Sequence, residues 1–254
     1  MGNHRCGWWM VPLASLAALA GPFLALPRAQ RNQPIYPAYD GFVKNADGSY
    51  TLSFAYFSHN AEVVKIPPGA DNTFEPTPGD RQQPTTFHPG HNRFQCVMVV
   101  DSAFDGKLRW TLTYAGTTTS TSQNMLQSNW NLVEGAGEMR AIEFAKVPRG
   151  VCLNRAPTVT ILGLTGRGRG GGSASVAMGE ALNLFGSVED EGLPRNASLA
   201  IEWKQLSGPG TTTFTNAKAA RTRATFSAPG VYQLQLTATD SEFTRSTLVN
   251  VTVK

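Results

Sequence analysis

The stretch Ala228-Pro-Gly-Val-Tyr-Gln-Leu-Gln-Leu-Thr-Ala-Thr-Asp240 decides the fold class of this chain. From Tyr232 to Ala238 every second residue is apolar, and the residues between them are Gln and Thr. A period of two puts the apolar side chains on one face of a β-strand and the polar ones on the other. The stretch therefore predicts a strand in a sheet that buries one face.

Similar runs surround this stretch. Leu199, Ile201 and Trp203 are predicted to point inward from one of them, with Glu202 and Lys204 outward. We expect seven short strands in all, near 157–161, 181–188, 199–206, 211–215, 221–227, 230–239 and 246–253. Short strands at regular spacing, separated by turns, are typical of a β-sandwich.

Three motifs in this half resemble the PKD-like family of extracellular domains, in particular its bacterial variants. They are Trp203-Lys-Gln-Leu-Ser-Gly-Pro-Gly210, Ala224-Thr-Phe-Ser-Ala-Pro-Gly-Val-Tyr232 and Leu236-Thr-Ala-Thr-Asp240, and the resemblance covers 156–254. It implies an immunoglobulin-like fold in which Trp203 is the core tryptophan and Tyr232 a tyrosine-corner residue, both structural. Many relatives follow the last Asp with Gly, whereas this chain has Ser241, so that turn is expected to differ.

The first half also reads as β structure. Asp47-Gly48 predicts a hairpin turn into an alternating strand over 49–57, and Asp105-Gly106 predicts a second hairpin leading into Leu108, Trp110 and Leu112. Between them lies a long Pro-rich loop over 66–91, whose Phe74 and Phe87 are expected to pack onto the sheet.

Segments of this half, among them Tyr39-Asp-Gly-Phe and Gln83-Pro-Thr-Thr-Phe-His-Pro-Gly, resemble a domain of uncharacterised exported bacterial proteins. That resemblance implies no activity.

The fold class predicted for the whole chain is all-β, with two β-sandwich-like domains in tandem, the second immunoglobulin-like. Pro148 and Gly150 break the strand pattern, and Pro157 opens a new strand. The expected organisation is a signal peptide and short leader over 1–29, a first domain over 34–146, a linker over 147–157 and a second domain over 158–254.

The first residues predict export. Arg5 precedes an apolar run over 7–19, and Ala18-Leu19-Ala20 suits signal peptidase. A membrane anchor is the alternative, but Pro12 and other prolines leave the apolar core shorter than about 18 residues. A secreted, periplasmic or cell-surface protein is expected, with no stable membrane span after cleavage.

The sequence has 3 cysteines, and Cys6 lies within the predicted signal segment. The remaining pair, Cys96 and Cys152, is a candidate disulfide, because disulfides persist in exported proteins. Two separately buried thiols are the alternative, and spacing does not decide between them.

The formal net charge of +4 comes from scattered Lys and Arg. No basic stripe is present, so a nucleic-acid partner is not predicted. The Gly-rich stretch over 166–173 carries only Arg167 and Arg169 and no aromatic residue. We expect it to form a flexible loop between the first two strands of the second domain.

Two segments offer weak candidates for a metal site. His88 and His91 are three residues apart, but Pro89-Gly90 makes a turn between them and no third ligand has a diagnostic spacing. The acidic turn from Glu189 through Asp190 to Glu191 offers oxygen ligands for calcium, although a solvated loop is the preferred interpretation. No catalytic residue, metal site or cofactor is therefore predicted.

Neither a Ser-His-Asp order nor a Gly-x-Ser-x-Gly turn can be assigned in this sequence, so no catalytic motif is predicted. The leading hypothesis is an exported non-catalytic protein that acts in adhesion, in envelope architecture, or in binding an envelope or extracellular protein or glycan. The alternatives are an accessory subunit of an envelope complex and a metal-dependent hydrolase.

Overall fold

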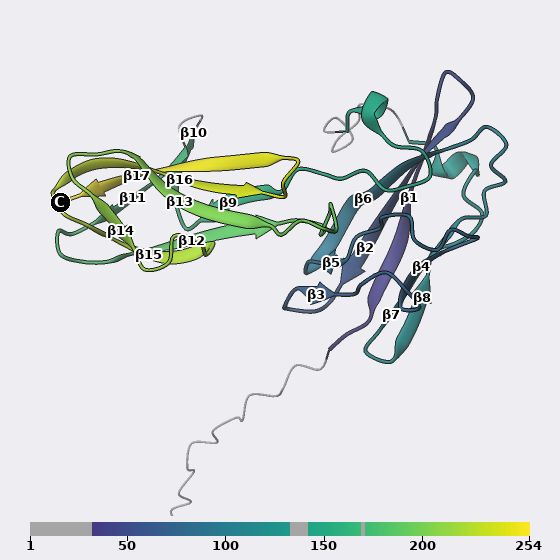
Figure 1. Ribbon diagram of the computed structural model, residues 1–254, viewed down its shortest axis with the longest axis horizontal. Helices are drawn as coiled ribbons and strands as arrows, with labels where there is room; N and C mark the ends of the chain where they lie inside the picture. Colours follow the sequence, from purple (N-terminus) through teal and green to yellow (C-terminus); the bar gives the residue numbers. More distant parts are fainter. Residues whose placement is uncertain (1–31, 133–141, 169–170) are drawn as a thin grey trace, which may run out of the picture. The chain divides into compact units, whose positions relative to one another are not determined.

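The computed structural model describes residues 32–132, 142–168 and 171–254, so the predicted signal segment and Cys6 lie outside the described residues. The described chain is all-β apart from two short 3-10 helices, η1 (Ser128–Trp130) and η3 (Phe144–Lys146). It forms two β-sandwiches in tandem, each with a hydrophobic core of its own, as the alternating runs predicted (Figure 1).

The first sandwich contains two three-stranded antiparallel sheets and one two-stranded ribbon. The strands are β1 (Ile35–Lys44), β2 (Tyr50–Ser58) and β6 (Gly90–Val100) in one sheet, β4 (Asn72–Glu75), β7 (Arg109–Tyr114) and β8 (Thr117–Ser120) in the other, and β3 (Val64–Lys65) with β5 (Thr86–Phe87) in the ribbon. Aromatic side chains fill the space between the sheets. Trp110 stacks on Phe74 at a centroid distance of 5.7 Å, and its indole N–H donates to Asn72 Oδ1 at 2.9 Å.

One predicted hairpin of this sandwich is confirmed and one is wrong. The Asp47-Gly48 turn joins β1 to β2, which pair in antiparallel register. The Asp105-Gly106 turn joins β6 to β7 instead, and these strands lie in different sheets. A turn dipeptide specifies a local reversal of the chain, but the partner of each strand is chosen by tertiary packing.

The Pro-rich segment over 66–91 is not a structureless loop. It contributes β4 and β5, and Phe74 and Phe87 are both buried in the main core, as expected from their spacing. Asn72 holds the segment in place, because its amide donates to the carbonyl oxygens of Ile66 at 3.0 Å and Pro84 at 2.8 Å.

Strand β6 departs from strict alternation. Phe94, Cys96 and Met98 would share one face of a regular strand, but only Cys96 and Met98 lie in the main core. Phe94 has a φ of 55° and lies next to a register shift between β2 and β6, so it packs with Val97 and Val99 in a cluster on the opposite face. A bulge of this kind turns the following side chains to the other face.

The second sandwich has nine strands where seven were predicted. One sheet has the order β10-β11-β17-β16-β13 and the other β14-β15-β12-β9. The strands are β9 (Thr158–Leu162), β10 (Thr165–Gly168), β11 (Gly171–Val176), β12 (Leu182–Glu189), β13 (Ala200–Ser207), β14 (Thr212–Phe214), β15 (Arg221–Phe226), β16 (Gly230–Thr239) and β17 (Thr244–Val253).

The two additional strands come from the Gly-rich stretch, which was expected to be a flexible loop. β10 pairs with β11 in antiparallel register, and β11 pairs in parallel with β17, as Figure 1 shows for β11 and β17. The flexible-loop interpretation is therefore wrong for the described part of the stretch. Glycine lowers strand propensity, but the parallel partner β17 supplies hydrogen bonds that no local pattern reveals.

The core of the second sandwich is centred on the stretch that decided the fold class. Tyr232, Leu234, Leu236 and Ala238 are all fully buried. The Tyr232 hydroxyl donates to the Ala228 carbonyl at 2.7 Å, and the Trp203 indole donates to the Ala220 carbonyl at 3.1 Å. Both large side chains thus satisfy their polar atoms within the core.

A disulfide joins Cys96 on β6 to Cys152, with the two Cα atoms 4.7 Å apart. It fastens the segment that follows the first sandwich to β6, an edge strand of the β1-β2-β6 sheet. A backbone hydrogen bond from Leu153 to Val97 at 2.8 Å continues the attachment. The chain is therefore held against the first sandwich until a few residues before β9 begins.

Replacing Trp203 with Ala is expected to lower the free energy of unfolding by about 3 to 5 kcal/mol, because truncation leaves a cavity in the core. Val231→Ala is the matched control, since Val231 also lies in this sandwich but is 62% exposed, and it should cost less than about 0.5 kcal/mol. Urea unfolding of both variants measures the difference. Equal losses would contradict the placement of Trp203 in the core.

Candidate functional site at the acidic turn

The acidic turn, which follows β12, packs against the first sandwich. The backbone amides of Thr85 and Thr86 both donate to the Glu191 carbonyl oxygen, at 2.9 and 3.1 Å. Leu193 is 3% exposed and belongs to the main core of the first sandwich, although it comes from the second half of the chain. The solvated-loop interpretation of this acidic turn is therefore wrong, because the turn is a packed contact.

The Glu191 side chain is buried with the turn. It is 4% exposed, and one carboxyl oxygen accepts a hydrogen bond from the Arg155 amide at 2.7 Å. Burial raises the pKa of the Glu191 carboxyl to about 7, with the Arg155 hydrogen bond acting in the opposite direction. The Arg155 guanidinium in turn donates to the Phe94 carbonyl at 2.9 Å. Arg155 thus connects the turn to β6.

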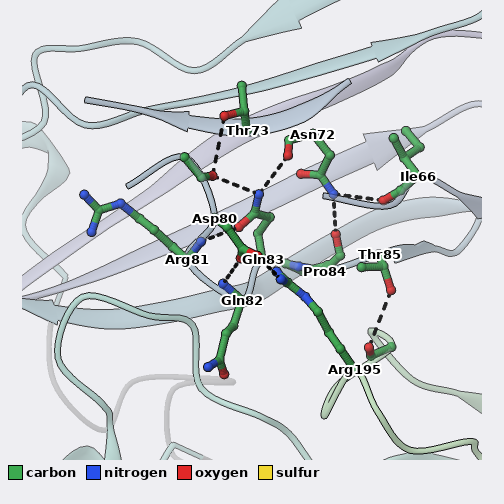
Figure 2. A network of polar contacts seen from close by, with 12 residues as sticks. Ile66, Asn72, Thr73, Asp80, Arg81, Gln82, Gln83, Pro84, Thr85 and Arg195 are labelled. Atoms are coloured by element: carbon green, nitrogen blue, oxygen red, sulfur yellow. Dashed lines mark hydrogen bonds and ion pairs between the residues drawn. The ribbon is translucent and has the colours of Figure 1, made fainter. Parts of the chain in front are cut away.

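An ion pair lies beside this contact. Arg195 follows the turn and pairs with Asp80, which lies in the Pro-rich segment of the first sandwich (Figure 2). The hydrogen-bonded Arg195 guanidinium lowers the pKa of the Asp80 carboxyl below its ordinary value. The Thr85 hydroxyl donates to the Gly192 carbonyl oxygen at 3.5 Å.

Gln83 gives the receiving segment its shape. Its side chain is fully buried, and its amide donates to the carbonyl oxygens of Asn72 at 2.9 Å and Gly79 at 3.2 Å (Figure 2). Its amide oxygen accepts from the Arg81 backbone N–H at 2.8 Å. A buried amide with both ends satisfied fixes a loop that has no regular structure. The acidic turn therefore packs against a segment whose shape is fixed by its own hydrogen bonds.

The structure brings the candidates His88 and Asp190 together but does not gather a set of metal ligands from the described residues. His88 Nε2 lies 3.0 Å from the Asp190 carbonyl oxygen and 3.2 Å from the Asp190 amide nitrogen, so it contacts backbone atoms of the turn. His91 lies elsewhere, with its ring 6.2 Å from that of Phe57, and Glu189 is exposed. Within residues 32–132, 142–168 and 171–254, no three His, Cys, Asp or Glu side chains are close enough to hold a metal ion.

A groove of about 730 Å³ lies beside the turn. Val63, Pro67 and Leu199 supply apolar surface, while Lys65 and Arg195 supply positive charge. Asp190 also lines it, and burial raises the pKa of its carboxyl above the ordinary value. The lining offers contacts for a bound chain segment and contains no nucleophile paired with a base.

Sequence reasoning named His88 in one weak candidate site and Asp190 and Glu191 in another, without predicting that the two segments meet, and it missed Leu193 and Arg195. Glu191 and Arg195 each contact a residue of the first sandwich about a hundred positions earlier in the chain. The one local signal was a charged residue in front of Gly192, which has a φ of +87°. That signal marks a turn and does not reveal what the turn contacts.

In the part of the chain that the structure describes, no helix is long and apolar enough to cross a membrane.

Comparison with known proteins places a PKD-like domain in the C-terminal half. A family model described as K319L-like, PKD domain matches residues 170–253. The solution structure of the PKD domain from KIAA 1837 protein matches with 21% identity and a TM-score of 0.26, covering 36% of this chain and 89% of that one. PKD domains and other immunoglobulin-like domains are typically non-catalytic adhesion or binding modules.

Tandem structures of other families match more of the chain. The titin Ig tandem domains A164-A165 match with 10% identity and a TM-score of 0.26, covering 87% of this chain and 99% of that one. Drosophila N-cadherin EC1-3 matches with 13% identity and a TM-score of 0.30, covering 88% of this chain and 68% of that one. At such TM-scores these likenesses carry no argument about function.

Replacing Gly192 with Ala is expected to disrupt the packed turn, because the new methyl group would collide with the hydroxyl oxygens of Thr85 and Thr86. Gly179→Ala is the matched control, since Gly179 has a φ of +86° and nothing within 4 Å of a new methyl group. Both variants bear the left-handed backbone strain, so Gly192→Ala should cost about 1 to 3 kcal/mol more. Urea unfolding measures the difference, and equal costs would contradict the packing of the turn.

The contribution of the packed turn to the free energy of unfolding should fall as pH rises. Burial raises the pKa of Glu191, so the packed state favours the protonated carboxyl over the ionised one. Its contribution to stability is complete below the ordinary pKa of 4.5 and is lost as pH rises through about 7. Glu191→Gln keeps the carbonyl that accepts from Arg155 but cannot ionise. The free energy of unfolding between pH 5 and 8 should therefore fall more steeply in the parent chain than in this variant, and parallel curves would refute the effect.

Proposed function

We propose that this chain is an exported, non-catalytic protein of a bacterial envelope or its exterior, which acts in adhesion or surface architecture by binding a protein or glycan. The observation that carries the proposal is the Cys96–Cys152 disulfide in a chain of two packed sandwiches. Disulfides persist in oxidising compartments and are rare in the cytosol. The pairing therefore supports export, in agreement with the apolar segment and its Ala-Leu-Ala site at the start of the sequence.

The use of the polar side chains supports binding in preference to catalysis. His88, Glu191 and Arg195 are engaged in contacts that hold the acidic turn, and Gln83 and Asn72 hold the segment that receives it. Their internal hydrogen bonds give these side chains a structural role. The PKD-like half adds a module of a class that typically binds or braces.

The accessory-subunit alternative differs from an adhesion role in the number of binding partners that it predicts. An accessory subunit would have one obligate protein partner, whereas an adhesion or architectural protein would contact an abundant surface polymer or several proteins.

Fractionation of the native cells, followed by crosslinking and mass spectrometry, tests the proposal. We expect the protein outside the cytosol, with a new N-terminus near residue 20, with the Cys96 and Cys152 peptides joined without reduction, and with crosslinks to envelope components. A full-length chain with two free thiols in the cytosol would overturn the proposal. Crosslinks to one protein at fixed stoichiometry would favour the accessory subunit.

A further inference from the structure

One face of the second sandwich carries an exposed row of side chains across three strands. In the sheet β14-β15-β12-β9, Phe185 on β12 is in register with Leu162 on β9 and with Arg221 on β15. Phe185 is 49% exposed and Leu162 is 51% exposed. Since neighbouring strands lie about 4.8 Å apart, the row is about 10 Å long. A second outward pair, Asn183 and Arg223, lies beside it.

The two arginines of this face are unpaired. Among the arginines whose side chains the structure describes, Arg93, Arg109, Arg149 and Arg195 form ion pairs, and Arg81, Arg155 and Arg245 donate to carbonyl oxygens. The Arg221 and Arg223 side chains have no ion-pair, hydrogen-bond or ring partner among the described residues. Two residues apart on one strand, they point to the same face about 7 Å from each other.

The face around the row is polar but almost free of negative charge. One of its other outward residues is an acid, Glu189. The remaining ones carry hydroxyl or amide groups, namely Thr158, Thr160, Asn183, Ser187, Thr213 and Thr225. Glu189 lies four residues along β12 from Phe185, which is about 13 Å for an extended strand. That distance exceeds the screening length at physiological salt, so the arginine pair presents uncompensated positive charge.

We propose that this face, defined by Leu162, Phe185, Arg221 and Arg223, binds an acidic polysaccharide, that is, a chain of sugars bearing carboxylate groups. The inference rests on the proposed binding function and names its site and ligand class. The apolar face of a sugar ring covers Phe185 and Leu162. Guanidinium groups recognise carboxylates through paired hydrogen bonds, so Arg221 and Arg223 take the acid groups. The flanking hydroxyl and amide side chains bond to the sugar hydroxyls.

An acidic polypeptide is disfavoured by the position of the row. Extended peptides bind sheets at an edge, where unpaired backbone groups form the new hydrogen bonds. Phe185 and Arg221 lie on β12 and β15, the two inner strands of this sheet. Phe185 is in register with Leu162 on one side and with Arg221 on the other, and the Arg223 carbonyl oxygen accepts from the Thr215 amide on the side away from β12. Recognition at this face must therefore use side chains alone, which suits rings and hydroxyls better than a peptide backbone.

Titration calorimetry with an oligogalacturonate of uniform length tests the proposal. The parent chain should bind this probe, bind it more weakly as salt increases, and bind neutral dextran at least about tenfold more weakly. Arg221→Gln/Arg223→Gln and, separately, Phe185→Ala should each lower the affinity for oligogalacturonate by about tenfold or more. Both variants change exposed side chains, so unfolding curves should match those of the parent.

Arg245→Gln/Lys254→Gln is the matched control, because it also removes two positive charges, one on β17 of the other sheet and one directly after that strand. Equal losses in the two double variants would show nonspecific attraction and overturn the site. Tighter binding of poly-glutamate than of oligogalacturonate, with the same dependence on Arg221 and Arg223, would overturn the polysaccharide class. Absence of oligogalacturonate binding would overturn this inference alone, because crosslinks to envelope components elsewhere on the chain would leave the proposed function standing.

Discussion

The described structure depends on the contact between the acidic turn and the segment that receives it. The Glu191 carbonyl oxygen accepts two amide hydrogen bonds, and Leu193 enters the main core of the first sandwich. A buried carboxyl is costly, and here the cost is offset by protonation near neutral pH and by the Arg155 amide. Without this contact the Leu193 side chain would be exposed and the Thr85 and Thr86 amides would lose their acceptor.

The other features of the chain are consistent with this contact. The disulfide holds the residues that precede β9 against β6. Arg155, three residues after Cys152, lies close to both Phe94 and Glu191. The Gln83 and Asn72 amides fix the Pro-rich segment that receives the turn. In such an arrangement the polar residues of the turn are structural, and the outer face of β12 and β15 remains exposed.

Local patterns predicted much of the fold. The alternation from Tyr232 to Ala238 identified the strand that builds the second core, and Phe74 and Phe87 correctly indicated a segment packed onto the first. Local patterns failed where the partner is distant in sequence. The Gly-rich stretch pairs with β17, the Asp105-Gly106 turn crosses between sheets, and Phe94 turns to the other face at a bulge. The acidic turn was misjudged for the same reason, since charge alone predicts solvent and only the tertiary partner makes burial of Glu191 possible.

Amide hydrogen exchange at Thr85 and Thr86 tests the central contact most directly. Both amides lie at the edge of the short ribbon of β3 and β5, and both donate to the Glu191 carbonyl oxygen. If the acidic turn is packed as described, both amides should exchange at least about a hundredfold more slowly than an unprotected amide, because exchange requires the turn to open. Exchange of both at the rate of an open loop, while the amides of the central strand β2 remain protected, would contradict the account.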